Sequence, residues 1–227
     1  MEIAANLQKI REQIATAAFA AKRDPAEVRL VAVSKTKPAA LVDEAARAGQ
    51  LLFGENYVQE FVAKSGEVVA PVTWHFIGHL QSNKVKQIAG IVAMIHSVDR
   101  LSLAEEIDRQ WGRIGQVCAI LIQVNVSGEA TKSGTTSEEA TNLVRQVALL
   151  ENVRICGLMT MPPFFDNPEA ARPYFRELRL LAAEIGAHAI PGVSMKELSM
   201  GMSGDFEAAI AEGATLVRIG SALFGSR

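Results

Sequence analysis

LVAVSKTKPAALVDEAARAG, residues 30–49, reads as a strand, a polar turn and a helix in succession. Residues 30–34 form a short apolar run rich in β-branched side chains, which is typical of a strand buried on both faces. Pro38 fits the first turn of a helix, and Gly49 is a good helix terminator. The stretch therefore predicts one β–α unit of the kind that builds a parallel sheet.

The same alternation continues along the chain, after a first helix in which Ile3, Leu7, Ile10 and Ile14 recur at steps of three and four. The further strand-like runs are 51–53, 74–77, 91–96, 117–126, 154–161, 197–200 and 215–219. The helix-like stretches between them are 56–63, 82–89, 101–113, 138–150, 168–185 and 205–212. Eight strands alternating with helices predict one α/β domain, residues 1–227, folded as a closed (β/α)₈ barrel. An open doubly wound sheet is the alternative, but no GxGxxG motif follows any strand.

The composition is that of an ordinary globular protein, with 49% hydrophobic residues, 21% charged residues and a formal net charge of −2. Acidic and basic residues are interspersed, so nucleic acid is not expected as a partner. No apolar run approaches the roughly 20 residues of a membrane span, and no signal peptide is recognisable. We therefore expect a cytoplasmic protein with no membrane association. Cys118 and Cys156 each lie in an apolar run and are expected to be reduced core residues.

Side chains that act on a ligand in a (β/α)₈ barrel follow the C-terminal ends of the strands. Lys35 directly follows the first apolar run, so its amine would stand at the mouth of the barrel. A pocket of low dielectric there would lower the pKa of the amine and free it for imine formation. The alternative is a plain surface lysine, which is the role we assign to Lys37.

The last two predicted strands are followed or interrupted by residues that could bind a phosphate or another ligand. Residues 200–205 are small and glycine-rich and precede a helix, and Gly220-Ser221 ends the eighth run. Barrels often bind phosphate with these loops and a helix N-terminus, although glycines also serve tight turns alone. Arg218 is a charged residue inside an apolar strand and needs a partner, which is either a ligand or an acid on a neighbouring element.

Other polar residues carry less weight. His75 and His79 lack the pattern of a metal site, and we predict none. Glu55 and Asp99 could form an acid–base pair, but separate loop carboxylates are more often structural. The methionines near the strand ends are expected to pack at the barrel mouth: Met159, Met161, Met200 and Met202.

Seven stretches that run nearly from end to end carry a family resemblance: VAVSKTKP (31–38), FGENYVQE (53–60), WHFIGHLQSNK (74–84), HSVD (96–99), QVNVSGEATKSG (123–134), GLMTMPP (157–163) and LSMGMSGDFEAAIAEGATLVRIGSALFG (198–225). With them the chain resembles the YggS/PROSC family of pyridoxal phosphate homeostasis proteins, which share the alanine racemase N-terminal barrel. A common variant of that family has proline where His79 stands, so we place no catalytic weight on His79.

The resemblance implies that pyridoxal 5′-phosphate (PLP) is the cofactor and that Lys35 forms a Schiff base with it. Ser203, Gly220 and Ser221, with the backbone of 200–202, would hold the phosphate. Asn56 would lie near the ring, and Arg218 would face the pyridine nitrogen, as the equivalent arginine does in fold-type III enzymes. A cationic partner disfavours protonation of that nitrogen, which mutes carbanion chemistry. The implied cofactor-binding set is Lys35, Asn56, Ser199, Met200, Ser203, Arg218, Gly220 and Ser221, with no catalytic residue.

The implied function is that of a carrier or buffer in intracellular PLP homeostasis rather than that of an enzyme. Related racemases add a C-terminal β-domain that brings a tyrosine base, whereas this chain ends at Arg227, just past the eighth predicted strand. Neither Tyr57 nor Tyr174 is expected to replace that base. The alternatives are a PLP-dependent racemase or related enzyme, and a regulatory protein that acts through a partner. We expect a monomer whose partners are PLP and apo forms of PLP-dependent enzymes.

Overall fold

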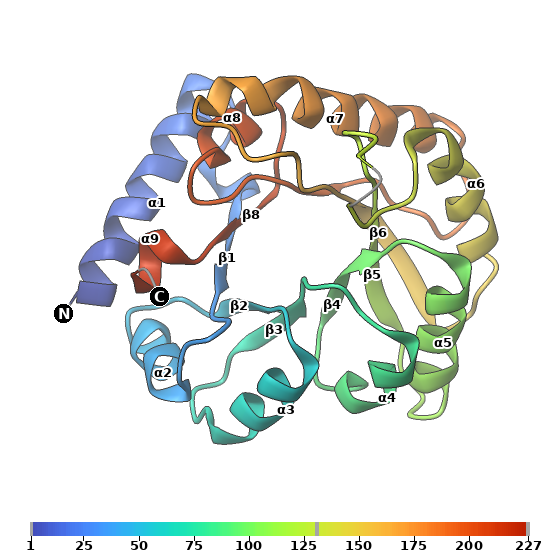
Figure 1. Cartoon of the computed structure of the whole chain (residues 1–227), viewed down its shortest axis with the longest axis horizontal. Helices are drawn as coiled ribbons and strands as arrows, with labels where there is room; N and C mark the ends of the chain where they lie inside the picture. The colour runs from blue at the N-terminus through green and yellow to red at the C-terminus, as the bar shows by residue number, and fades with distance from the viewer. Residues whose placement is uncertain (1, 130–131, 226–227) are drawn as a thin grey trace.

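The computed structural model describes residues 2–129 and 132–225 and forms a closed barrel of eight parallel strands (Figure 1). Each strand pairs with its neighbours in chain order, and the first pairs with the last, where Val31 lies opposite Arg218. The predicted closed barrel is confirmed, and the open sheet is wrong because β1 and β8 pair with each other instead of forming edges. The strands are β1 (Arg29–Val33), β2 (Leu52–Glu55), β3 (Thr73–Phe76), β4 (Met94–Val98), β5 (Cys118–Gln123), β6 (Val153–Met159), β7 (Glu197–Ser199) and β8 (Leu216–Ile219).

Helices surround the barrel on its outside (Figure 1). The α-helices are α1 (Glu2–Ala20), α2 (Ala39–Arg47), α3 (Val58–Glu67), α4 (Val85–Ile88), α5 (Leu101–Gly112), α6 (Ser137–Val147), α7 (Arg172–Ala187), α8 (Phe206–Ala211) and α9 (Ser221–Phe224). Short 3₁₀ helices are η1 (Pro25–Glu27), η2 (Ser82–Lys84) and η3 (Pro168–Ala171). The first helix, α1, precedes the first strand and contacts the last two helices, α8 and α9, so the two ends of the chain meet on one side of the barrel.

The apolar core has two layers, because successive side chains of a strand point to opposite faces. On β1, Val31 belongs to a small cluster inside the barrel, whereas Ala32 belongs to the large cluster between strands and helices. The cluster inside the barrel consists of Val31, Met94, Ala119, Leu121, Met159 and Leu216. The same alternation places His75, His96, Ser199 and Arg218 on the inner face, since their strand neighbours Trp74, Ile95, Leu198 and Val217 belong to the outer layer.

The structure differs from the sequence-based prediction in several local features. Strand β2 continues to Glu55, so Gly54 and Glu55 are strand residues rather than loop residues. Residues 82–89 form η2 followed by the single turn α4, and α9 is a short helix that the apolar pattern does not indicate. Cys118 is a buried free thiol as expected, whereas the free thiol of Cys156 is only half-buried and packs at the margin of the cluster inside the barrel.

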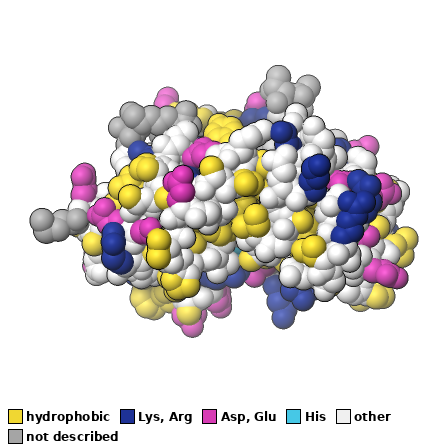
Figure 2. All heavy atoms as spheres, turned by 90° about the horizontal axis from the view of Figure 1, so that it is seen from below, with side chains coloured by type: hydrophobic (Ala, Val, Ile, Leu, Met, Phe, Trp, Pro, Cys, Tyr) yellow, Lys and Arg dark blue, Asp and Glu magenta, His cyan; other side chains and the backbone are white. Residues whose placement is uncertain are grey.

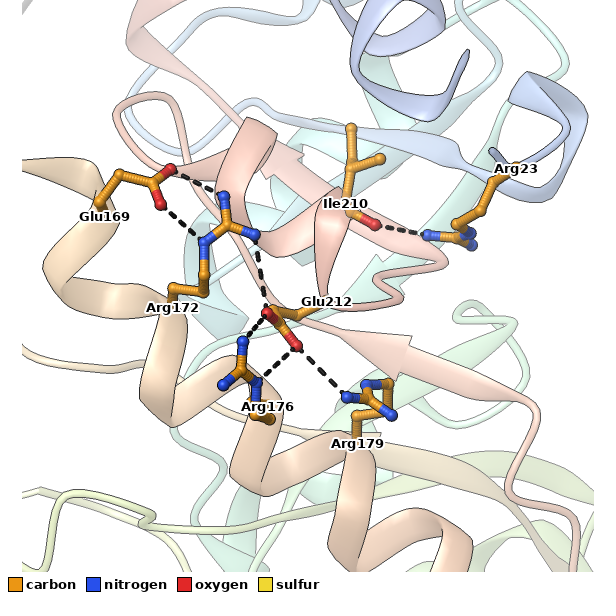
Figure 3. Close-up of polar contacts among 7 residues, drawn as sticks. All are labelled: Arg23, Glu169, Arg172, Arg176, Arg179, Ile210 and Glu212. Atoms are coloured by element: carbon orange, nitrogen blue, oxygen red, sulfur yellow. Dashed lines mark hydrogen bonds and ion pairs between the residues drawn. The ribbon is translucent and has the colours of Figure 1, made fainter. Parts of the chain in front are cut away.

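A buried carboxylate, Glu212, fixes the end of α8 against α7 (Figure 3). Three arginines of α7 point toward it at 2.9–3.6 Å: Arg172, Arg176 and Arg179. Burial opposes ionisation, but the hydrogen bonds and charges of Arg176 and Arg179 outweigh it and hold the pKa of Glu212 below its usual value. On the other side, Arg23 donates to the carbonyl oxygen of Ile210 at 2.9 Å. The C-terminal end of α8 is thus held from two sides.

The surface carries both signs of charge, with apolar side chains scattered between them on the face that Figure 2 shows. Among the described residues, no helix combines the length and apolar content that a bilayer span requires. Within the same residues, no group of three or more His, Cys, Asp or Glu side chains is placed to hold a metal ion.

Candidate functional site

A cavity of about 590 Å³ opens where the C-terminal ends of several strands meet, which is where this fold places ligand sites. Its wall contains most of the residues predicted from the sequence: Lys35, Asn56, Ser203, Arg218, Gly220 and Ser221. The other two, Ser199 and Met200, do not line it, because both side chains are fully buried. Met200 packs in the outer core, and Ser199 holds Arg218 from below.

A second lysine, Lys64 on α3, holds the segment that carries Lys35. The Lys64 side chain is 5% exposed, and its Nζ donates to the carbonyl oxygen of Ser34 and to Glu55 Oε1, both at 2.6 Å. Glu55 Oε1 also accepts from the Ser34 hydroxyl at 2.7 Å. Burial raises the pKa of Glu55, and the hydrogen bonds from Lys64 and Ser34 oppose that rise. The peptide immediately before Lys35 is therefore anchored to a buried ion pair.

The same lysine reaches the other side of Lys35 through Glu60. Glu60 Oε1 accepts from Lys64 at 2.7 Å and from the backbone N–H of Thr36 at 2.5 Å. Thr36 has a φ of 61°, in the left-handed region that a β-branched residue rarely adopts. The contacts of Glu60 offset this backbone strain, as is common beside functional side chains. Lys35 is consequently presented to the cavity from a backbone that is fixed on both sides.

Replacing Lys64 by methionine is expected to lower the free energy of unfolding by about 3 kcal/mol, because the buried Glu55 carboxylate would lose its cation. Urea unfolding of the purified variant measures the change. Lys86→Met, which removes an exposed lysine from α4, is the matched control. Equal stabilities of the two variants would show that Lys64 does not stabilise this segment.

Arg218 enters the cavity wall from inside the barrel. Its Nη1 donates to Ser199 Oγ at 2.6 Å, and its Nη2 donates to the carbonyl oxygen of Thr160 at 2.9 Å. No carboxylate among the described residues lies within ion-pair distance of it, but Asp205 on the loop after β7 acts on its charge at longer range and raises its pKa. Burial lowers the pKa of Arg218 to about 10, which leaves a cation at neutral pH. A cation held by neutral acceptors retains the capacity to interact with a ligand.

The loops after β7 and β8 meet beside the cavity. The Ser221 hydroxyl donates to Ser203 Oγ at 3.3 Å, and both residues line the wall. Asp205 folds back onto its own loop and accepts the backbone N–H of Met202 at 2.6 Å. Helices α8 and α9 are only six and four residues long, so the predicted contribution of helix dipoles is small and the hydroxyls carry more weight.

Asn56 contributes an amide with unmet hydrogen-bonding capacity. Its Oδ1 is buried and has no hydrogen-bond partner among the described residues. Gly78 packs against its backbone so closely that a Cβ there would lie 2.2 Å from the carbonyl oxygen of Asn56. A buried polar atom without a partner is costly in a native protein and is typical of a site completed by a ligand.

Several other predicted residues stay outside the site. Glu55 pairs with Lys64 and Asp99 pairs with Arg100 at 2.7 Å, so the two carboxylates form no acid–base pair. Tyr57 is 51% exposed, and Tyr174 stacks on Phe165 at 5.8 Å between ring centroids. Neither tyrosine lines the cavity, and the imidazole of His79 is exposed.

Sequence reasoning missed an apolar part of the wall that comes from the long segment between β6 and α7. Met161 was expected at the barrel mouth, but the apolar residues that follow it were not: Phe164, Phe165, Pro168 and Ala171. The length of the segment was the available signal, since long loops in compact domains are usually functional. Phe164 is 84% exposed at this edge, so the cavity is bordered by apolar surface in contact with solvent.

The barrel and its cavity define the class of the alanine racemase N-terminal domain, and the sequence model of that family matches residues 3–227. A pyridoxal phosphate homeostasis protein of Pseudomonas aeruginosa is 48% identical over 226 residues, covering 99% of this chain and 96% of its own. The homologue of the same name from Aquifex aeolicus is 45% identical over 228 residues, covering 100% and 99% of the two chains. PipY of Synechococcus elongatus, solved with PLP bound, superimposes with a TM-score of 0.87 at 39% identity, covering 98% of this chain and all of PipY. The chain belongs to the family of pyridoxal phosphate homeostasis proteins, as its sequence motifs predict.

Proposed function

We propose that this protein binds PLP in the cavity described above and acts as a carrier or buffer of the cofactor. The observation that carries the proposal is the convergence of Lys35, Arg218 and the Ser203–Ser221 pair on one cavity. An amine, a buried cation and a hydroxyl pair match the aldehyde, the ring nitrogen and the phosphate of PLP. When bound, the cofactor supplies an aldehyde carbon to which the Lys35 amine adds with loss of one water molecule.

The residues of this chain divide the work of binding. Lys64 and Glu60 fix the backbone around Lys35, so the amine meets its target with little conformational freedom to lose. Ser203 and Ser221 offer hydroxyl donors to the phosphate. Arg218 keeps a positive charge beside the ring nitrogen and disfavours a second one there. Asn56 completes the wall on the opposite loop.

We further propose that the protein does not turn over amino acids. Its relatives are named homeostasis proteins, and no tyrosine or histidine of the described residues lines the cavity to serve as a second base. The unprotonated ring that Arg218 favours is a weak electron sink. The regulatory alternative, the monomeric state, the cytoplasmic location and the apo-enzyme partners remain predictions.

Two assays with the PLP-loaded protein test the proposed function. Cofactor transfer to an apo PLP-dependent enzyme is expected to exceed the rate of simple dissociation, and chiral analysis of alanine and serine is expected to show no turnover. Failure of wild-type protein to bind PLP would overturn the proposal. Turnover at about 1 s⁻¹ or faster, in the usual enzyme range, would instead establish an enzyme. Cofactor transfer no faster than simple dissociation would show that the protein is a passive buffer of PLP and does not deliver it to enzymes.

Ser203→Asp is expected to weaken PLP binding about a hundredfold, because the new carboxylate would face the phosphate dianion across a partly buried site. Binding of pyridoxal, which lacks the phosphate, is expected to fall much less. Titration of both ligands measures the two effects, and Ser203→Asn controls for side-chain size. The same loss for pyridoxal as for PLP would argue against a phosphate role for this loop.

A further inference from the structure

A chain of hydrogen bonds runs through the inside of the barrel beneath the cavity and joins four strands. His75 Nδ1 lies 2.8 Å from His96 Nε2, and His96 Nδ1 lies 2.9 Å from Ser199 Oγ. Ser199 Oγ lies 2.6 Å from Arg218 Nη1 at the cavity wall. All four side chains are buried, with His96 and Ser199 fully excluded from solvent. The chain therefore links the buried cation to two histidines that the proposed function has not used.

Arginine fixes the direction of this chain, because a guanidinium group donates hydrogen bonds and accepts none. Ser199 Oγ must accept from Arg218. Among the described residues, the one acceptor within reach of the Ser199 proton is His96 Nδ1. His96 consequently carries its proton on Nε2 and donates it to His75 Nδ1, so every donor in the chain points away from the cavity.

Both histidines are neutral in this arrangement. Burial lowers the pKa of His75 to about 3, with a smaller effect from Arg29. Burial also lowers the pKa of His96 well below its usual value, and His75 and Arg218 add to the effect. A neutral imidazole has one ring nitrogen that can accept a hydrogen bond, and an imidazolium has none. By keeping His96 neutral, burial preserves Nδ1 as the acceptor for the Ser199 hydroxyl.

We infer that His96, supported by His75, is a positioning residue for Arg218: its Nδ1 accepts the hydrogen bond of the Ser199 hydroxyl and thereby fixes Ser199 Oγ as an acceptor for the guanidinium. This inference rests on the proposed function, because Arg218 is assigned to the ring nitrogen of PLP. Hydrogen bonds in such a chain polarise one another, so a hydroxyl that donates to His96 is a better acceptor for the cation. The hydrogen-bond acceptors of the guanidinium are then neutral, with Asp205 acting on it only at longer range, and its remaining donor capacity is left for the cofactor.

The direction of the chain has a second effect on the ring nitrogen. A proton could reach that nitrogen from inside the barrel only if every hydrogen bond in the chain reversed. Arg218 would have to accept, which it cannot do. His96 and His75 therefore deliver no proton to the ring from this side. Loss of the hydrogen-bond chain would also leave the Arg218 guanidinium less firmly held at the cavity wall, and a weaker positive charge beside the ring nitrogen is expected to increase the proton affinity of the bound cofactor.

The first test concerns the protein without cofactor and is independent of PLP binding. Long-range ¹⁵N–¹H correlation spectra of the imidazoles are expected to show His96 and His75 neutral, with the His96 proton on Nε2. A His96 proton on Nδ1, or a protonated imidazole at neutral pH, would overturn the inference whether or not PLP binds.

The second test uses protein loaded with PLP labelled with ¹⁵N in the ring. In wild-type protein the ¹⁵N shift is expected to report an unprotonated ring from pH 5 to 8. His96→Leu is expected to raise the proton affinity of the ring nitrogen about tenfold, and Ser199→Ala is expected to do the same if His96→Leu does not fold. His96→Asn, whose amide oxygen can replace Nδ1 as the acceptor, is expected to restore the wild-type signal.

Ser97→Ala is the matched control, because Ser97 is the buried neighbour of His96 on β4 and its Oγ has no hydrogen-bond partner among the described residues. An unchanged ring signal in both His96→Leu and Ser199→Ala would overturn the inference. A change of equal size in Ser97→Ala would do so as well, since it would reveal general disturbance of β4. Absence of PLP binding by wild-type protein would refute the proposed function. The tautomer measurement would then still test the direction of the hydrogen bonds from Arg218 to His75.

Discussion

Lys35→Ala is expected to abolish covalent binding of PLP completely while leaving the fold intact. The visible absorbance of the bound cofactor would disappear, and borohydride followed by proteolysis would give no labelled peptide. The physical reason is that the hydrogen bonds on both sides of Lys35 fix its backbone and so direct its amine to the cavity. The side chain is half-buried and lies outside the apolar core, so its removal leaves the packed clusters unchanged.

Lys37→Ala is the matched control, because Lys37 also lines the cavity, although its Nζ donates to the carbonyl oxygen of Phe224 at 3.2 Å. This variant is expected to retain the covalent bond. If the adduct in wild-type protein maps to Lys37, or survives in Lys35→Ala, the assignment of Lys35 is wrong.

Lys35 and Arg218 could be found from the sequence because each carries a local signal. Lys35 follows a buried strand at the position where barrels place their ligands, and Arg218 interrupts an apolar strand. The strand order was equally accessible, because the alternation of apolar runs and helical stretches persists along the chain. Strand boundaries were harder to predict. The end of β2 is an example, since Gly54 and Glu55 resemble a turn in sequence.

Lys64 and His96 could not be found in this way. Lys64 lies on a helix, where a lysine is most often exposed, and only the packing of α3 against Glu55 buries it. His96 and Ser199 are 103 residues apart, and they meet only because the barrel closes and turns both inward. Contacts across the inside of a barrel depend on strand registers, which periodicity does not specify.

Acid is expected to destabilise this protein strongly between pH 7 and pH 5, well above the usual range of carboxylate titration. Urea unfolding of the cofactor-free protein is expected to show that the free energy of unfolding falls by about 4 kcal/mol over this interval because of the two buried histidines together. The pKa of His75 falls to about 3 in the folded chain, mainly through burial, and that of His96 also falls well below the ordinary value of 6.5. In the unfolded chain both would take up protons near pH 6.5.

The sign of this effect follows from proton counting. Between pH 6.5 and the folded-state pKa, the unfolded chain binds protons that the folded chain refuses, so stability falls as the pH falls. Each histidine contributes about 1.4 kcal/mol per pH unit once the pH is below 6.5. Glu55 and Asp205 act in the opposite direction, because burial raises the pKa of both carboxyl groups.

Comparison with histidine variants separates the two contributions. His96→Asn and His75→Gln are each expected to reduce the loss between pH 7 and pH 5 by about 2 kcal/mol, because each removes one group that takes up a proton only after unfolding. His79→Asn, which removes an exposed histidine, is expected to leave the loss as in wild-type protein. A wild-type loss that persists in full in both buried-site variants would show that these histidines are not held neutral. The donor direction through Ser199 would then fail with them, because only a neutral imidazole can accept its proton.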